Sequence, residues 1–81
     1  MLIASSHELG LYIKSRRQKL NLTQKALSEL VGLQQKTISA IENAPDNVRV
    51  ATLFKVMSAI ECYMMLYPKD ETPETTWDEE W

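Results

Sequence analysis

Apolar side chains recur every three or four positions between residues 9 and 60, and this spacing predicts a series of short amphipathic helices. The first helix begins near Ser5, because Ser5 and Glu8 have the spacing of a capping box, which satisfies backbone N–H groups at a helix start. Asn21 and Leu22 interrupt the pattern. One face of this helix carries Leu9, Ile13, Arg17 and Leu20.

Three further helices follow. Thr23 is suited to cap the second helix, and Gly32 is suited to the left-handed position just past its end. The third helix runs from about residue 34 to residue 43, residues 44–47 have turn chemistry, and the fourth helix runs from about residue 51 to residue 61. The apolar positions are Ala26, Leu27, Leu30 and Val31 in the second helix, and Leu53, Phe54, Met57 and Ile60 in the fourth.

An uninterrupted apolar and aromatic run follows the fourth helix. Its residues are Cys62, Tyr63, Met64, Met65, Leu66 and Tyr67. A strand with two apolar faces needs cover on both sides, and a single strand is not stable alone. We therefore expect this strand to pair with the same strand of a second chain. The alternative is that the fourth helix continues through the run. The predicted fold is an all-α four-helix domain with one C-terminal strand that pairs across a homodimer.

Composition separates the chain into two regions. Residues 1–67 carry eight Lys and Arg against five Asp and Glu, a net charge of +3, whereas residues 68–81 carry one Lys against six acids, a net charge of −5. The first region is the expected folded domain, and the second has the composition of a disordered, flexible acidic tail. A chain of 81 residues is at most one domain with a small core, so oligomerisation is a plausible source of stability.

Cysteine and histidine content excludes several classes of site. With one Cys and one His the chain can form neither an internal disulfide nor a zinc site, and we expect no metal or cofactor. The sequence lacks a Gly-rich phosphate-binding loop and a pair of acidic residues suited to catalysis, so an enzyme is not predicted. A free thiol, no signal peptide and no long apolar segment together predict a cytoplasmic protein.

The second helix, the turn at Gly32 and the third helix have the outline of a helix-turn-helix. In such a motif the second of the two helices enters the DNA major groove, and its first residues contact base edges. Here these residues are Gln34, Gln35 and Lys36, and Gln and Lys side chains pair well with adenine and guanine edges. Taken without the motif, three polar residues at a helix start would simply be solvated.

The segment "LTQKALSELVGLQQKTISAIEN" resembles the helix-turn-helix of the Cro/C1-type repressor family, and the resemblance covers about residues 6–61. It implies a homodimer whose strands pair across the two-fold axis, and an ion pair between Arg17 and Glu42. Ser28 stands where the family usually has Ala. The matching residues are Leu22, Thr23, Gln24, Leu27, Gly32, Gln35, Thr37, Ile38, Ser39, Ile41, Glu42 and Asn43.

The resemblance also assigns DNA contacts. One departure leaves the frame of the third helix open, because many relatives have Ser or Thr at position 34, whereas Gln34 is a poor helix cap. The implied base-contacting residues are Gln34, Gln35, Lys36 and Ser39, and the implied phosphate-contacting residues are Gln24, Thr37, Asn43, Asn47 and Arg16.

The sequence "ENAPDN", the strand-like run and the acidic tail ending in Trp81 are similar to HipB-type antitoxins. That resemblance implies a sequence-specific DNA-binding protein that represses its own operon at an inverted repeat and neutralises a HipA-type kinase toxin. Trp77 and Trp81 are then expected to bind the partner, since exposed aromatics are typical interface anchors. The alternatives are a tail that folds back on its own domain or a dispensable end.

Three other functions remain as alternatives. The first is a stand-alone Cro/C1-type repressor without a toxin, which would not need the tail. The second is a protein scaffold that uses the same helices without DNA. The third is an enzyme that uses Cys62, although a small apolar role in a dimer core accounts for that residue.

Overall fold

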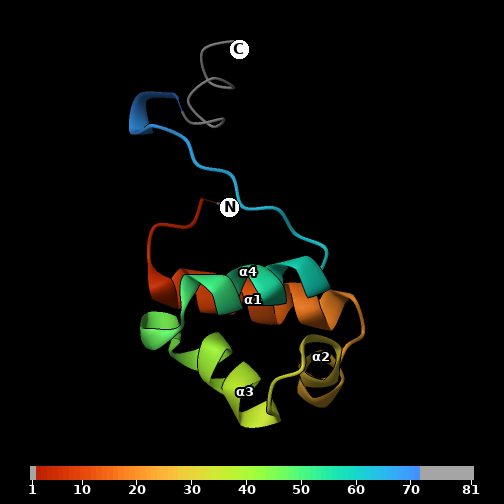
Figure 1. Ribbon diagram of the computed structural model, residues 1–81. Helices are drawn as coiled ribbons and strands as arrows, with labels where there is room; N and C mark the ends of the chain where they lie inside the picture. The colour runs from red at the N-terminus through yellow and green to blue at the C-terminus, as the bar shows by residue number, and fades with distance from the viewer. Residues whose placement is uncertain (1, 72–81) are drawn as a thin grey trace.

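Four α-helices and two short 3₁₀ helices make up residues 2–71, the part of the chain that the computed structural model describes (Figure 1). The prediction of four helices is confirmed. The elements are α1 (Ser6–Lys19), α2 (Gln24–Val31), α3 (Gln35–Asn43), η1 (Pro45–Asn47), α4 (Val50–Ala59) and η2 (Lys69–Glu71).

The predicted starts of the first two helices are confirmed by their capping hydrogen bonds. Ser5 Oγ accepts from the backbone N–H of Glu8 at 3.2 Å at the start of α1. Thr23 Oγ1 accepts from the N–H of Ala26 at 3.0 Å at the start of α2. Gly32 ends α2 in the left-handed conformation, with φ of 70°, which an L side chain would disfavour. These ends are set by local chemistry, which explains why the sequence predicts them.

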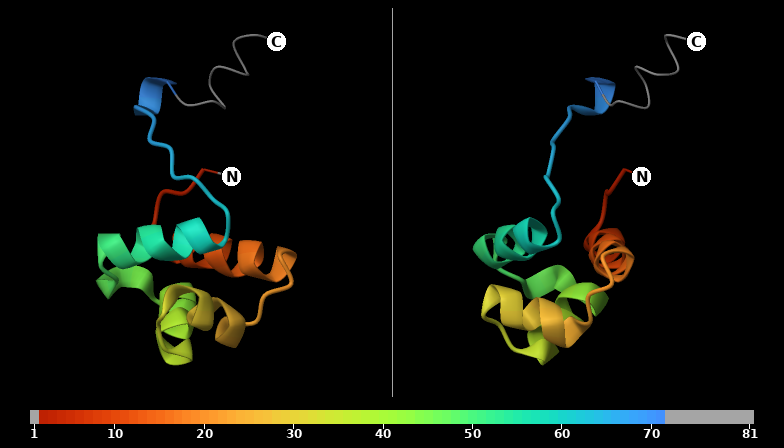
Figure 2. Two further views of the ribbon diagram at one scale, coloured as in Figure 1. Left: turned by 45° about the vertical axis from the view of Figure 1, so that its right-hand side comes forward. Right: turned by 90° about the vertical axis from the view of Figure 1, so that its right-hand side faces the viewer.

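The four helices lie in two layers. Helices α1 and α4 form one layer, and α2 and α3 form the other, as two views of the molecule show (Figure 2). Helix α3 packs against both α1 and α2, and α2 also packs against α4. The segment after α4 leaves the helical body on the side away from α2 and α3 (Figures 1 and 2). The helix-turn-helix and the strand-like run therefore lie on opposite sides of the domain.

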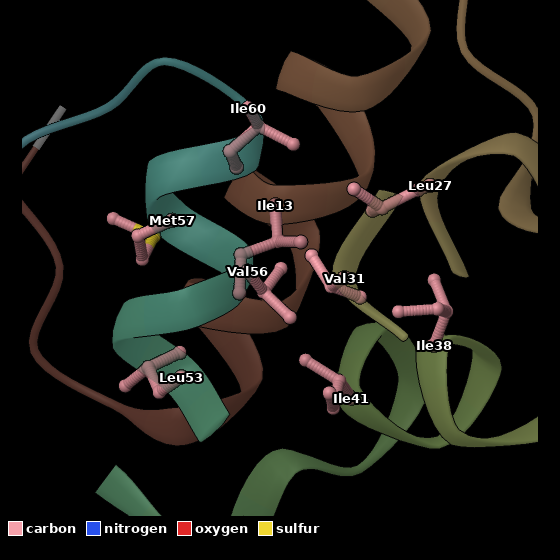
Figure 3. Packing of buried hydrophobic residues seen from close by; sticks show 9 residues of the cluster. All are labelled: Ile13, Leu27, Val31, Ile38, Ile41, Leu53, Val56, Met57 and Ile60. Carbon is pink, nitrogen blue, oxygen red and sulfur yellow. The ribbon is translucent and has the colours of Figure 1, made fainter. Parts of the chain in front are cut away.

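The core is an apolar cluster to which all four helices contribute (Figure 3). Two of the apolar positions lie outside the core: Leu30 and Phe54 are 64% and 52% exposed. Leu27 and Val31 lie one turn apart on the buried side of α2, and Leu30 lies about 100° around the helix from Val31. Phe54 similarly follows Leu53, which is the buried position. The cluster consists of Ile13, Leu27, Val31, Ile38, Ile41, Leu53, Val56, Met57 and Ile60.

Helix α4 ends at Ala59, two residues earlier than expected. The N–H of Cys62 donates back to the carbonyl of Met57 at 3.0 Å, and Glu61 has a positive φ of 57°, so the chain turns out of the helix. The alternative in which the fourth helix continues through residues 62–67 is therefore wrong. Residues 2–71 contain no strand within the single chain. A strand paired only with a second copy would have no ladder inside one chain, so its pairing stays a prediction.

A close approach of α1 to α3 depends on Gly10. A Cβ atom at this position would collide with the backbone carbonyl oxygen of Glu42, and the carbonyl oxygen of Ile41 would lie only 3.1 Å away. The sequence interpretation missed this role. A signal was present, because glycine inside a helix costs about 1 kcal/mol relative to alanine and usually has a packing reason when it occurs there.

Candidate nucleic-acid interface

The turn between α2 and α3 sets the frame of α3. After Gly32 the N–H of Leu33 donates to the carbonyl of Ser28 at 2.9 Å, which closes the end of α2. Gln34 is then the N-cap of α3 and has extended backbone, and its side chain makes no capping hydrogen bond. Helix α3 therefore begins at Gln35, one residue later than expected. This settles the frame that the poor capping residue had left open.

The start of α3 is exposed while its middle is buried. Gln34, Gln35 and Lys36 are all exposed, whereas Ile38 and Ile41 belong to the core and hold the helix on the domain (Figure 3). A helix anchored in this way presents its first turn outward. This geometry is the one that contacts of these three side chains to base edges would need. Solvation alone would not require the three polar residues to lie together on the outward turn of an anchored helix.

The end of α3 is organised by Asn43. Its Nδ2 donates to the backbone carbonyl of Ser39 at 2.9 Å and to Ser39 Oγ at 3.3 Å. Asn43 is exposed and Ser39 is half-buried. The structure thus brings together one expected base-contacting residue and one expected phosphate-contacting residue through a side-chain hydrogen bond.

An open hollow lies alongside α3 and continues to η1. Its lining includes Thr37 and Asn47, two of the expected phosphate-contacting residues, and the small side chains of Ala40 and Ala44. Small residues leave this side of α3 accessible. The complete lining is Thr37, Ala40, Ile41, Ala44, Asn47 and Val48.

Behind α3 lies a buried ion pair. Arg17 Nε donates to Glu42 Oε2 at 2.6 Å and Arg17 Nη2 donates to Glu42 Oε1 at 3.1 Å, so the pair is bidentate, and the ion pair implied by the family resemblance is confirmed. Arg17 Nη1 also donates to the carbonyl of Leu22 at 2.7 Å, which ties the loop before α2 to the pair. Gln24 Nε2 donates to Glu42 Oε1 at 3.1 Å. One carboxylate therefore joins α1, α2 and α3.

Arg16 has a different position from the other expected phosphate contacts. Its Nε donates to the carbonyl of Ile60 at 3.0 Å, at the end of α4 and beside the start of the strand-like run. The guanidinium has five N–H groups, so this hydrogen bond leaves others available. This contact places Arg16 of α1 beside the end of α4, and these two helices form the layer opposite α2 and α3 (Figure 1).

Tyr12 and Cys62 meet in the same region. The Tyr12 hydroxyl and Cys62 Sγ share a hydrogen bond of 3.5 Å. This hydrogen bond, together with burial and the charge that Cys62 can carry, raises the pKa of Tyr12 above its ordinary value of 10.0, against a smaller lowering by Arg16. Cys62 packs against the core at the start of the run, which fits a structural role for the thiol.

Residues 2–71 contain no group of three or more His, Cys, Asp or Glu side chains arranged to hold a metal ion. None of the helices in this part of the chain is both long enough and apolar enough to cross a membrane. The predictions for Trp77 and Trp81 lie outside the described residues.

An α2–turn–α3 unit with an exposed polar first turn on α3 defines the helix-turn-helix class of DNA-binding domain. Residues 13–64 match the sequence family described as Helix-turn-helix. Antitoxin HipB of Escherichia coli strain K12 is 39% identical over 75 residues, which cover 91% of this chain and 85% of that relative. Antitoxin HipB of Escherichia coli O6:H1 is 38% identical over 73 residues, with 89% and 78% covered. The chain therefore belongs to the helix-turn-helix family that includes antitoxin HipB.

Solved structures show the same fold. A chain of the HipA-HipB-O2-O3 complex superimposes with a TM-score of 0.80 at 36% identity, over 85% of this chain and 97% of that one. A restriction-modification controller protein superimposes with a TM-score of 0.68 at 26% identity, over 72% of this chain and 75% of that one.

Proposed function

We propose that this protein is a sequence-specific DNA-binding antitoxin, which represses its own toxin–antitoxin operon and neutralises a HipA-type kinase toxin. The observation that carries the proposal is the exposed first turn of α3, with Gln35 and Lys36 directed outward from a helix that Ile38 and Ile41 anchor. Its relatives support the rest, since similar chains occur in complexes of HipB with operator DNA and with HipA.

In the proposed complex the start of α3 lies in the major groove. Gln34, Gln35, Lys36 and Ser39 contact base edges, and each good bidentate contact contributes about 1–3 kcal/mol of discrimination. Neighbouring polar groups contact phosphates and supply affinity that falls as salt concentration rises. The residues proposed for phosphate contact are Gln24, Thr37, Asn43, Asn47 and Arg16.

The proposed active form is a homodimer in which the run of residues 62–67 forms a strand that pairs with its copy. Tyr63 and Leu66 are 96% and 89% exposed in the single chain, and the large apolar side chains between them are exposed as well, which is typical of an interaction surface. A two-fold dimer presents two copies of α3 to successive major grooves, about 34 Å apart, so the operator should be an inverted repeat. Residues 1–67 form the DNA-binding and dimerisation domain in this proposal.

Residues 68–81 form the proposed toxin-binding tail, with Trp77 and Trp81 as anchors. Its sequence supports this role, because two tryptophans among acidic residues are suited to a partner's pocket. The proposed compartment is the cytoplasm, where both the operator and the kinase toxin would be present.

A stand-alone repressor without a toxin is the second candidate. The specific observation in its favour is the similarity to a restriction-modification controller protein, which shares the fold at 26% identity. The two candidates share the DNA-binding face and differ in whether a second protein binds.

The test is a pull-down from lysate of the source cell with full-length protein as bait. A stoichiometric protein of kinase size, identified by mass spectrometry, supports the antitoxin. The Trp77→Ala/Trp81→Ala variant should lose this partner and keep DNA binding, whereas a matched Thr75→Ala/Thr76→Ala variant of the same tail should keep both. Capture of DNA alone by the full-length bait contradicts the antitoxin proposal and favours the stand-alone repressor.

A further inference from the structure

Glu42 makes one hydrogen bond that its ion pair does not require. The side chain is 1% exposed, and both of its oxygens already accept from Arg17. Oε1 accepts a second hydrogen bond, from Gln24 Nε2 at 3.1 Å. Gln24 is the first residue of α2 and is only half-buried, so part of it is accessible to solvent.

We propose that Glu42 and Arg17 are positioning residues that orient the amide of Gln24 for a DNA phosphate. This inference rests on the proposed function, in which Gln24 contacts phosphate. A carboxylate only accepts hydrogen bonds, so Glu42 selects the orientation in which Gln24 turns its nitrogen inward. The opposite orientation would place the amide oxygen against the carboxylate oxygen, which is repulsive.

The selected orientation is the one that a phosphate needs. Nε2 has two N–H groups, and Glu42 occupies one of them. The second remains on the same nitrogen and can donate to a phosphate oxygen, which also only accepts. A free glutamine can exchange the positions of its oxygen and nitrogen, whereas the hydrogen bond to Glu42 fixes the nitrogen, and the second N–H of that nitrogen is the donor proposed to meet the phosphate. Binding then loses less side-chain entropy, because the donor is already ordered.

Arg17 makes this arrangement compatible with DNA. An uncompensated carboxylate one hydrogen bond away from a phosphate would repel it. The bidentate guanidinium cancels that charge inside the protein, and its contact with the Leu22 carbonyl holds the loop that leads into α2. The pair thereby links the position of a phosphate at α2 to the position of α3, whose first turn contacts the bases.

A double-mutant cycle on DNA affinity tests the proposal. The probes are a duplex selected by wild-type protein from a random-sequence library and a scrambled duplex of the same composition. The variants are Gln24→Ala, the paired Arg17→Met/Glu42→Met replacement, and their combination. Replacing both partners of a buried ion pair by apolar residues of similar size often preserves stability, and circular dichroism identifies the temperatures at which every variant is folded.

The expected result is non-additive. Gln24→Ala should weaken binding to both duplexes about tenfold, because a phosphate contact acts regardless of sequence. The paired replacement should cause a similar loss alone and no further loss when Gln24 is already Ala. If the pair has only a structural role, the fold losses in DNA affinity of Gln24→Ala and of the paired replacement should instead multiply in the combined variant. Multiplying losses, or full affinity after the paired replacement, would overturn the proposal.

A measurement on wild-type protein keeps the proposal testable if the paired replacement unfolds. The side-chain NH₂ signals of Gln24 in nuclear magnetic resonance spectra should be rigid in the free protein and should shift on addition of the scrambled duplex. A mobile amide, or signals that do not respond to DNA, would also overturn it. If wild-type protein selects no duplex at all, the proposed function fails; if it selects one and the cycle is additive, only the positioning inference fails.

Discussion

Gly10 of α1 lies directly against the backbone carbonyl of Glu42 in α3, and this contact sets how closely α3 packs on α1. Gly10→Ala should lower the free energy of unfolding by about 1–3 kcal/mol, because the added Cβ forces two helices apart. The change should destabilise even though Ala favours a helix by about 1 kcal/mol over Gly. Chemical denaturation measures the difference.

The matched control for Gly10→Ala is Ser15→Ala, at an exposed position of the same helix. It should change stability by no more than about 0.5 kcal/mol. A Gly10→Ala protein as stable as wild type would show that α1 and α3 can separate at no cost.

Replacement of Gln35 and Lys36 together with Ala should remove most of the specific DNA affinity. Each base contact contributes about 1–3 kcal/mol, so a loss of several kcal/mol is expected on the selected duplex, with a smaller loss on a scrambled one. Fluorescence anisotropy measures both affinities, and analytical ultracentrifugation should show unchanged association. Lys55→Ala, on the exposed face of α4, is the control that should have little effect. Unaltered specific affinity would exclude this helix as the reader of the sequence.

The strand pairing is tested by a charge placed within the run of residues 62–67. Leu66→Asp should convert the dimer to a monomer, because a buried carboxylate without a partner is costly at an interface with apolar faces. Lys69→Asp, an exposed residue of η2 just outside the run, is the control that should leave the dimer intact. Sedimentation velocity distinguishes the two species. A Leu66→Asp protein that stays dimeric would place the dimer interface elsewhere.

The hydrogen bond between Tyr12 and Cys62 predicts a pH dependence. The folded-state pKa of Tyr12 lies above 10.0, the ordinary value that applies when the chain is unfolded. The folded state therefore favours the protonated phenol. The contribution to stability is complete below pH 10.0 and is lost as the pH rises through the folded-state pKa.

Ultraviolet absorbance of tyrosinate measures this shift. The transition that is missing in Tyr12→Phe should have its midpoint above 10.0 in the native protein. Cys62→Ala should lower that midpoint, because the Cys62 hydrogen bond is the largest cause of the shift. A Tyr12 midpoint at or below 10.0 in the native wild-type protein would contradict the contact.

Local patterns in the sequence determined the helices and their order. Ser5, Thr23 and Gly32 cap or end helices through atoms a few residues away, so their roles can be predicted from the sequence without knowledge of the fold. The helix-turn-helix spacing and the polar start of α3 likewise lie within one continuous segment. Family resemblance added the one long-range contact that the sequence predicted, between Arg17 and Glu42, and the structure confirms it.

Contacts between segments far apart in the sequence were decided by the tertiary structure. The need for glycine at Gly10 arises from a carbonyl in another helix, and the orientation of Gln24 arises from a carboxylate 18 residues away. Leu30 and Phe54 belong to the apolar positions of their helices, but the buried arc of each helix is narrower than its apolar face, and packing against neighbouring helices decides which part is covered. The sequence by itself determined where the helices form and which helix is proposed to read DNA, because both depend on neighbouring residues. Packing decided how that helix is held, because its supports come together only in the folded chain.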